Sequence, residues 1–147
     1  MKATDQVTVT FTSRSANEGF ARSCAACYAA QLDPNLDELA DIKTAVSEAV
    51  TNSSVHAYPD TLGKITMRLR LLEGNELEIQ IKDTGIGIPD VEQARTPLFT
   101  TGHEERSRMG FPIMESFMDK LTVRSTPGKG TTVTMKKRIA RRAGGVR

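Results

Sequence analysis

Apolar residues recur along the chain with two different periods, which predict where strands and helices lie. They alternate with threonines over Val7–Thr12, which predicts a strand. A spacing of three and four residues predicts helices over Ser15–Gln31 and Leu36–Val55. The segment Asp33-Pro34-Asn35 separates these helices, because proline disfavours helical geometry at the residue before it.

The second half of the chain returns mostly to a period of two. Alternation over Ile65–Leu71 and Leu77–Ile81, with the turn Glu73-Gly74-Asn75 between them, predicts an antiparallel hairpin. The other expected segments are a loop-rich stretch over Asp83–Arg108, a helix over Gly110–Met118, and strands over Leu121–Ser125 and Thr131–Lys137. Strands and helices do not strictly alternate, so we predict an α+β fold, a two-layer sandwich with helices on one face of a mostly antiparallel sheet.

Charge and length narrow the classes of function. The 147 residues include 20 basic and 18 acidic ones, and this balance argues against a protein that binds nucleic acid over its whole surface. Six basic residues and no acidic ones fall between Lys136 and Arg147, so the other 135 residues have 14 basic against 18 acidic residues, a net charge of −4. We expect one domain over residues 1–138 and a flexible basic tail over residues 139–147.

The sequence shows no targeting signal and no cysteine pattern typical of a metal site. No apolar run approaches the ~18 residues of a membrane span, and the N-terminus lacks a signal-peptide core, so we expect a cytoplasmic protein without membrane contact. Cys24 and Cys27 are three residues apart, but no second pair of ligands follows at zinc-site spacing. We therefore interpret both cysteines as small packing residues.

The first candidate for chemistry is Glu48-Ala49-Val50-Thr51-Asn52 in the second predicted helix. Glu48 and Asn52 are four residues apart, so their side chains share one helical face beside the apolar stripe. A carboxylate can accept a proton, and an amide oxygen suits a hard cation such as Mg²⁺. The alternative is an ordinary polar pair on a solvated face.

The second candidate, Lys82-Asp83-Thr84-Gly85-Ile86-Gly87-Ile88-Pro89, lies at the end of a predicted strand. Gly85 and Gly87 permit a sharp turn and close approach of the backbone to a ligand, and Asp83 can accept a hydrogen bond from the exocyclic amine of a base. The segment lacks the third glycine of a dinucleotide-binding motif and the lysine of a P-loop. The alternative is a tight turn without a ligand.

The third candidate is the segment Pro97–Gly110, which is rich in Thr, Gly, Arg and Ser and contains Arg106 and Arg108. It leads into a predicted helix, whose unpaired N–H groups would suit a phosphate chain. Few apolar residues would anchor it, so it is a plausible lid, and the alternative is a mobile surface loop. Together the three candidates describe a single nucleotide site.

The order and spacing of these motifs resemble the GHKL family of ATPases and kinases, with its N box and two glycine boxes. The resemblance covers roughly Val7 to Lys137 and is strongest to the anti-sigma serine kinases of that family. The segments that carry it are Phe20-Ala21-Arg22, Glu48-Ala49-Val50-Thr51-Asn52, Pro97-Leu98-Phe99-Thr100-Thr101, Met109-Gly110-Phe111, Ile113-Met114-Glu115 and Gly130-Thr131-Thr132. The resemblance implies the GHKL (Bergerat) ATP-binding fold.

The resemblance also implies a role for each site residue. Glu48 would act as the catalytic base on a protein serine, and Asn52 would hold the Mg²⁺ that bridges the ATP phosphates. Asp83 would recognise the adenine with help from Thr131, and Gly85 and Gly87 would shape the pocket. Arg106 and Gly110 would belong to a lid over the phosphates. Arg22 would contact a partner protein. The implied partners are a sporulation sigma factor of the F type, the anti-anti-sigma protein as phosphorylation substrate, and a second copy in a homodimer.

Two positions depart from the family pattern. Arg108 stands where the second glycine box usually begins with glycine, and a non-glycine residue at positive φ costs ~1–2 kcal/mol. Pro112 replaces a more usual threonine, in a first helical turn where proline is tolerated. We interpret His56 and Tyr58, just after the N box, as packing and helix-end residues.

The leading hypothesis is therefore an ATP-dependent protein-serine kinase that also sequesters a sigma factor. One alternative is the stand-alone ATPase domain of a histidine kinase, although no helical phosphoacceptor segment precedes Val7. The other alternative is a nucleotide-gated sigma-binding module with weak or no kinase activity, which the departure at Arg108 keeps open.

Overall fold

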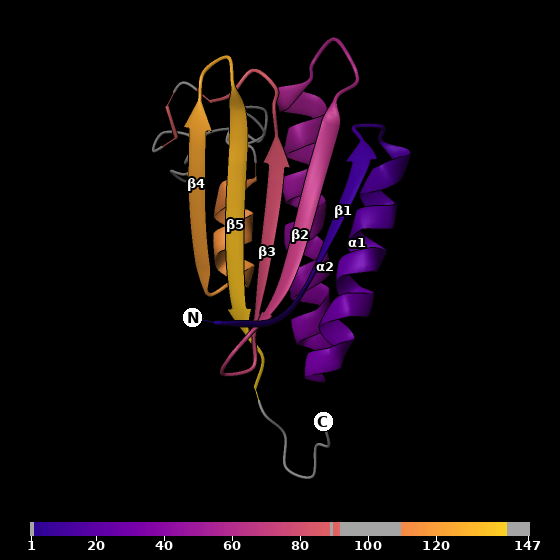
Figure 1. Cartoon of the computed structure of the whole chain (residues 1–147), viewed down its shortest axis with the longest axis vertical. Coiled ribbons are helices and arrows are strands. Elements are labelled where there is room, and N and C mark those ends of the chain that lie inside the picture. Colours follow the sequence, from indigo (N-terminus) through magenta and orange to yellow (C-terminus); the bar gives the residue numbers. More distant parts are fainter. Residues whose placement is uncertain (1, 89, 92–109, 141–147) are drawn as a thin grey trace.

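The computed structural model describes residues 2–88, 90–91 and 110–140, and its elements follow the predicted order (Figure 1). The strands are β1 (Ala3–Thr12), β2 (Lys64–Leu72), β3 (Glu76–Asp83), β4 (Lys120–Thr126) and β5 (Gly130–Arg138). The helices are α1 (Ala16–Ala29), η1 (Ala30–Leu32), α2 (Leu36–Thr51), η2 (Asn52–Ala57) and α5 (Phe111–Phe117). The basic tail from Arg141 onward lies outside the described residues.

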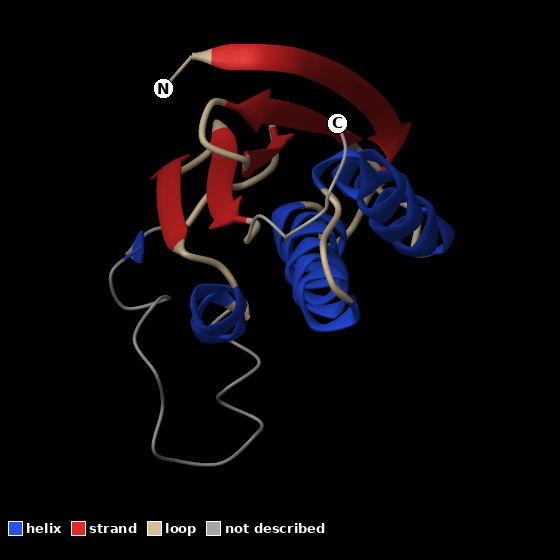
Figure 2. Cartoon of the chain, turned by 90° about the horizontal axis from the view of Figure 1, so that it is seen from below, coloured by secondary structure: helices blue, strands red, loops and turns tan. Residues whose placement is uncertain are grey.

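The five strands form one sheet in the order β1-β2-β3-β5-β4, and every neighbouring pair is antiparallel. Alternate residues of β3 face the helices, and Leu77, Ile79 and Ile81 are buried there. Figure 2 shows α1, α2 and α5 together on one side of the sheet. The predicted α+β sandwich is therefore confirmed, with a sheet that is antiparallel throughout the described strands.

The apolar stripe of α2 supplies much of the core between the two layers. Ile42, Val46 and Val50 are fully buried, as their three-four spacing predicts. The helix begins at a capping box, in which the Asn35 side chain and the Glu38 side chain each bond the other residue's backbone N–H. In the part of the chain that the structure describes, no helix has the length and apolar character needed to cross a membrane.

Two elements differ from their predicted bounds. The predicted helix over Leu36–Val55 is α-helical only to Thr51 and continues as the π-helical turn η2, which widens the backbone next to the sheet. Strand β1 begins at Ala3 rather than at Val7, because the polar residues before Val7 still pair with β2. Backbone pairing thus extends the strand beyond the part in which apolar alternation is visible.

Candidate functional site

Asp83, at the end of β3, is the buried acidic centre of the site. Its Oδ1 accepts hydrogen bonds from the backbone N–H of Gly85 at 3.0 Å and of Thr131 at 3.2 Å. Its Oδ2 accepts one from the Ser53 hydroxyl at 3.1 Å. These donors come from the following turn, from β5 and from η2, so the carboxylate joins three segments that are distant in sequence.

The burial of Asp83 has an electrostatic cost. The residue is only 5% exposed, and burial raises the pKa of its carboxyl group above the usual value. Hydrogen bonds from Gly85, Ser53 and Thr131 lower the pKa but offset only part of this effect. Because a carboxylate offers about four lone-pair sites, Oδ2 still has capacity to accept a bond from a ligand donor.

The turn after β3 passes between η2 and the β4–β5 turn, and this path requires two glycines. A Cβ at Gly85 would collide with the carbonyl oxygen of Ala57, whose oxygen accepts a hydrogen bond from the Ile86 N–H at 3.0 Å. Gly87 has a φ of +79° and would collide with the carbonyl of Thr126 if it carried a Cβ. The two glycines allow the backbone to pack against both neighbours.

Thr131 approaches Asp83 through its backbone, while its hydroxyl points to another residue. The Thr131 Oγ1 lies 2.8 Å from the Ser125 Oγ, which also accepts a hydrogen bond from the Ile88 N–H at 2.7 Å. Ser125 thus ties β4, β5 and the glycine turn together. This arrangement fixes the wall of the site opposite η2.

Tyr58 is buried, as expected of a packing residue, and it also positions the turn. Its hydroxyl accepts a hydrogen bond from the Thr84 N–H at 2.8 Å and donates one to the Lys64 carbonyl at 2.8 Å. His56, within η2, is partly buried, and burial lowers the pKa of its imidazole. It is therefore predominantly neutral at pH 7.

A small cavity beside Asp83 brings several predicted site residues together. Its volume is about 20 Å³, which is room for about one water molecule. Four predicted residues, Asn52, Asp83, Gly87 and Thr131, contribute to its lining. The lining consists of Ala49, Asn52, Ser53, His56, Ala57, Asp83, Gly87, Ile88, Phe111, Thr131 and Val133. A nucleotide base would have to lie in the mouth of this cavity or displace its walls.

Glu48 lies one helical turn before Asn52 and meets the start of α5. Gly110, the N-cap of α5, has a φ of +67°, and a Cβ there would collide with Oε1 of Glu48. Glu48 is partly buried, and burial, with the nearby charge of Glu18 as a second cause, raises the pKa of its carboxyl group. A raised pKa makes this carboxylate a stronger proton acceptor.

Arg22 lies on α1 near the same end of α2. Its guanidinium donates hydrogen bonds to Glu18 Oε2 at 2.8 Å and to the hydroxyl of Ser47 at 3.1 Å. Its side chain is 40% exposed, so it can still reach a partner. The bond to Ser47 connects this surface arginine to the turn of α2 that carries Glu48, whereas Glu18 lies on α1 itself.

Several sequence predictions fall on residues that the structure does not describe. Arg106 and Arg108 of the expected phosphate lid, and the segment Pro97–Thr101, are among residues 92–109, outside the described part of the chain. Within the described part, sequence patterns did not point to Ser53 or Ser125 as site residues. Both act through hydrogen bonds to residues 30 or more positions away, which local periodicity does not reveal.

Comparison with known proteins supports the assignment of the family. Residues 11–137 match the family described as Histidine kinase-like ATPase domain. The chain is 54% identical to the anti-sigma F factor of Caldanaerobacter subterraneus subsp. tengcongensis, over 96% of this chain and 99% of that protein. It is 52% identical to the anti-sigma F factor of Geobacillus kaustophilus, over 89% and 90% of the two chains.

Solved structures support the same fold. The RsbU and RsbW domains of a Mycobacterium tuberculosis protein superpose with a TM-score of 0.68 at 19% identity, over 94% of this chain and 33% of that one. At this identity the likeness concerns the fold alone. The sheet order, the buried acid at the end of β3 and the match over residues 11–137 all indicate one family. The chain belongs to the histidine kinase-like (GHKL) ATPase domain family, whose members bind nucleotide.

Proposed function

We propose that this protein is an anti-sigma factor that binds and inhibits a sporulation sigma factor of the F type. In this proposal it also uses ATP to phosphorylate a serine of its anti-anti-sigma antagonist. The observation that carries the proposal is the near end-to-end match, at 54% identity, with an anti-sigma F factor. The arrangement of Asn52, Asp83 and Thr131 around one cavity supports nucleotide binding at the expected place.

The nucleotide would bind with its adenine over Asp83. Among the described residues, the Oδ2 of Asp83 accepts a hydrogen bond from Ser53 alone, so it can accept a second one from the exocyclic amine. Gly85 and Gly87 hold the backbone close to η2 and to the β4–β5 turn, which shapes the floor beneath the base. The backbone N–H of Thr131, in β5, holds the Asp83 carboxylate in place, and Thr131 also lines the cavity.

Glu48 and Asn52 would serve the phosphate end of the site. The Asn52 amide oxygen is a hard donor of the kind that Mg²⁺ accepts, and bound Mg²⁺ would supply positive charge to the ATP phosphates. Glu48 would accept the proton of the substrate serine hydroxyl while the serine oxygen forms a bond to the γ-phosphorus. The bond between the γ-phosphorus and the bridging oxygen breaks, and ADP leaves.

Partner contact and lid function complete the proposal. Arg22 would contact the sigma factor or the anti-anti-sigma protein, and its partial exposure on α1 supports this role. Gly110 would end the lid, which includes Arg106, directly beside Glu48. A homodimer is expected, and its mass in solution can be measured by light scattering. This function would place the protein in the cytoplasm with its sigma factor.

A phosphorylation assay tests the proposal. Incubation with γ-labelled ATP, Mg²⁺ and the anti-anti-sigma protein should label serine in the wild type. Glu48→Gln should abolish the label while retaining ATP binding, because the amide cannot accept the proton. Glu73→Gln, at an exposed position in the β2–β3 turn, is the matched control and should retain full activity.

Three outcomes would contradict parts of the proposal. Label on histidine would indicate a histidine kinase-type activity instead. Absence of label with intact ATP binding would favour a nucleotide-gated binding module. For sigma binding, Arg22→Ala should weaken the complex without changing ATP affinity, and an unchanged sigma affinity would remove Arg22 from the interface.

A further inference from the structure

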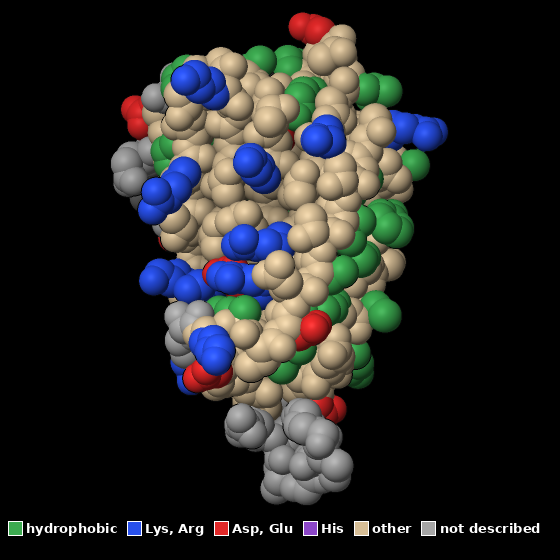
Figure 3. All heavy atoms as spheres, viewed as in Figure 1, with side chains coloured by type: hydrophobic (Ala, Val, Ile, Leu, Met, Phe, Trp, Pro, Cys, Tyr) green, Lys and Arg blue, Asp and Glu red, His purple; other side chains and the backbone are tan. Residues whose placement is uncertain are grey.

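The face of the sheet away from the helices carries an ordered set of basic side chains. Figure 3 shows Lys and Arg gathered over this face. Strand register arranges its side chains in rows that run across β2, β3, β5 and β4. The first row is Arg70, Glu78, Lys136 and Lys120; the second is Arg68, Gln80, Thr134 and Thr122; the third is Thr66, Lys82, Thr132 and Arg124.

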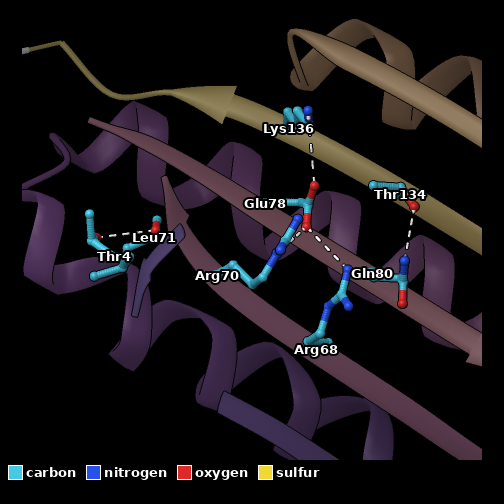
Figure 4. A network of polar contacts seen from close by, with 8 residues as sticks. All are labelled: Thr4, Arg68, Arg70, Leu71, Glu78, Gln80, Thr134 and Lys136. Carbon is cyan, nitrogen blue, oxygen red and sulfur yellow. Dashed lines mark hydrogen bonds and ion pairs between the residues drawn. The ribbon is translucent and has the colours of Figure 1, made fainter. Parts of the chain in front are cut away.

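Glu78, the acid of the first row, is already neutralised. Its Oε1 accepts a hydrogen bond from Arg70 at 2.6 Å and lies 3.4 Å from Arg68, and its Oε2 lies 3.9 Å from Lys136 (Figure 4). The side chain of Glu78 is only 6% exposed, beneath these three cations. The acid therefore offers little negative charge to the surface.

The other cations of the three rows lack such a partner. Among the described residues, no carboxylate lies within ion-pair distance of Lys82, Lys120 or Arg124. Lys120 also stands directly opposite Lys136 across the β4–β5 pair, an arrangement of like charges that destabilises a sheet. Fold stability does not explain the pairing of Lys120 with Lys136, whereas a bound acidic group would.

A groove lies over β3, β5 and β4 between the basic rows. Its volume is about 250 Å³, and the hydroxyl and amide groups of Thr122, Thr134 and Gln80 form its floor. Lys120 and Lys136 border the groove in the first row, and Arg124 borders it in the third. The two basic ends are four residues apart along the strands, or roughly 13 Å at the rise of a β-strand.

We propose that this groove binds an acidic, extended segment of a partner protein, with two carboxylates spaced as residues i and i+4. One carboxylate would lie between Lys120 and Lys136 and the other at Arg124, while the peptide groups bond to the polar floor. An extended chain reproduces the ~13 Å separation, because it has the same rise per residue as the strands. The groove is distinct from the nucleotide site, which lies on the helical side of the sheet.

The chemistry of the groove favours a protein over a single-stranded nucleic acid. Its lining residues are Glu78, Gln80, Lys120, Thr122, Arg124, Thr134 and Lys136. None is aromatic, so the groove has no platform for base stacking, on which single-strand binding depends. The near-neutral charge of the whole chain also differs from that of typical nucleic-acid binders.

A short synthetic threonine peptide with two glutamates four residues apart is the probe. Binding to the full chain is measured by fluorescence anisotropy at low and high salt, and the groove is identified by amide shifts in NMR spectra. Control peptides carry glutamine at both positions or two adjacent glutamates. We expect the spaced acidic peptide to bind more tightly than either control and to weaken with salt, because the contacts are exposed ion pairs.

Single-charge variants link this binding to the groove. Lys120→Gln and Arg124→Gln should each weaken the spaced peptide about two- to fivefold. Lys43→Gln, an exposed lysine on the helical layer, is the matched control and should bind like the wild type. Lys120→Gln should also raise the unfolding midpoint of the free protein, because it removes the charge opposite Lys136.

The outcomes separate the alternatives. Equal binding of the spaced, adjacent and glutamine peptides would overturn the proposal, as would equal binding by wild type, Lys120→Gln and Arg124→Gln. Tighter binding of a single-stranded oligonucleotide than of the spaced peptide at the same residues would replace the protein partner by a nucleic acid.

Discussion

Asp83→Asn tests the buried carboxylate as a binding group while preserving the fold. Asparagine has nearly the same shape, so its Oδ1 can keep the bonds from Gly85 and Thr131, and its amide can donate to Ser53. The folded-state pKa of Asp83 is raised, so above that pKa the ionised carboxylate lowers stability, and protonation as the pH falls removes this cost. We therefore expect the free energy of unfolding at pH 7 to change by less than about 1 kcal/mol.

The same substitution should have a large effect on ATP. If the adenine amine donates to Oδ2, asparagine places an N–H donor against that amine. Loss of a hydrogen bond to a charged acceptor costs about 1.5–3 kcal/mol, which weakens ATP binding about ten- to 150-fold. Guanine presents a carbonyl oxygen at the corresponding position, and the asparagine amide can donate to it. The preference for ATP over GTP should therefore decrease or reverse.

Calorimetric titration of wild type and Asp83→Asn with ATP and GTP measures both effects, and urea unfolding measures stability. Asp60→Asn, an exposed residue in the loop before β2, is the matched control and should change none of these quantities. An equal loss of affinity for ATP and GTP would refute base recognition by Asp83. A loss of several kcal/mol of stability would instead show that the carboxylate is mainly structural.

Two further substitutions test the contact between Gly110 and Glu48 and the role of Glu78 on the face of the sheet away from the helices. Gly110→Ala sets a methyl group against Glu48 at positive φ, so phosphate transfer in initial-rate assays should fall about tenfold. An unchanged rate would contradict the close approach of Gly110 to Glu48. Burial alone would raise the pKa of Glu78, but Arg70, Arg68 and Lys136 hold it below its usual value, so Glu78→Gln should cost roughly 1–3 kcal/mol at pH 7. This difference should shrink as the pH falls through the lowered pKa of Glu78, and urea unfolding that shows a pH-independent difference would contradict the ion-pair network.

The sheet and its buried face were predictable because they depend on local alternation. The hairpin pattern assigns Leu77, Ile79 and Ile81 to one face, and all three are buried. The stripe of α2 was predictable from its three-four spacing and is buried from Ile42 onward, but its start differs: Leu39 is only partly buried. Leu36 is 84% exposed, because it is the first residue after the N-cap, at the end of the helix where little of the chain packs against it.

The candidate site was predictable in its motifs but not in its contacts. Asp83 and its two glycines stood out because a strand end followed by closely spaced glycines is a local signal. Ser53 did not stand out, and Tyr58 was interpreted only as a packing residue, because their bonds to Asp83 and Thr84 span 30 and 26 residues. The π-helical turn that directs them had no recognisable sequence signal either, since Asn52-Ser53-Ser54 also suits a helix end.

At two places in the described part of the fold, charged side chains lower the stability of the folded state. Each of these places adjoins a proposed binding site. Asp83 is an acid buried where desolvation raises its pKa, and its protein donors leave room for one more. Lys120 faces Lys136 across the β4–β5 pair, and among the described residues only Lys136 of the two has an acid, Glu78, within ion-pair distance. Residues that lower stability without a packing benefit are expected where a ligand supplies the missing interaction. If both proposals hold, adenine would complete the hydrogen bonding of Asp83 on the helical side of the sheet, and an acidic segment would lie between Lys120 and Lys136 on the face away from the helices.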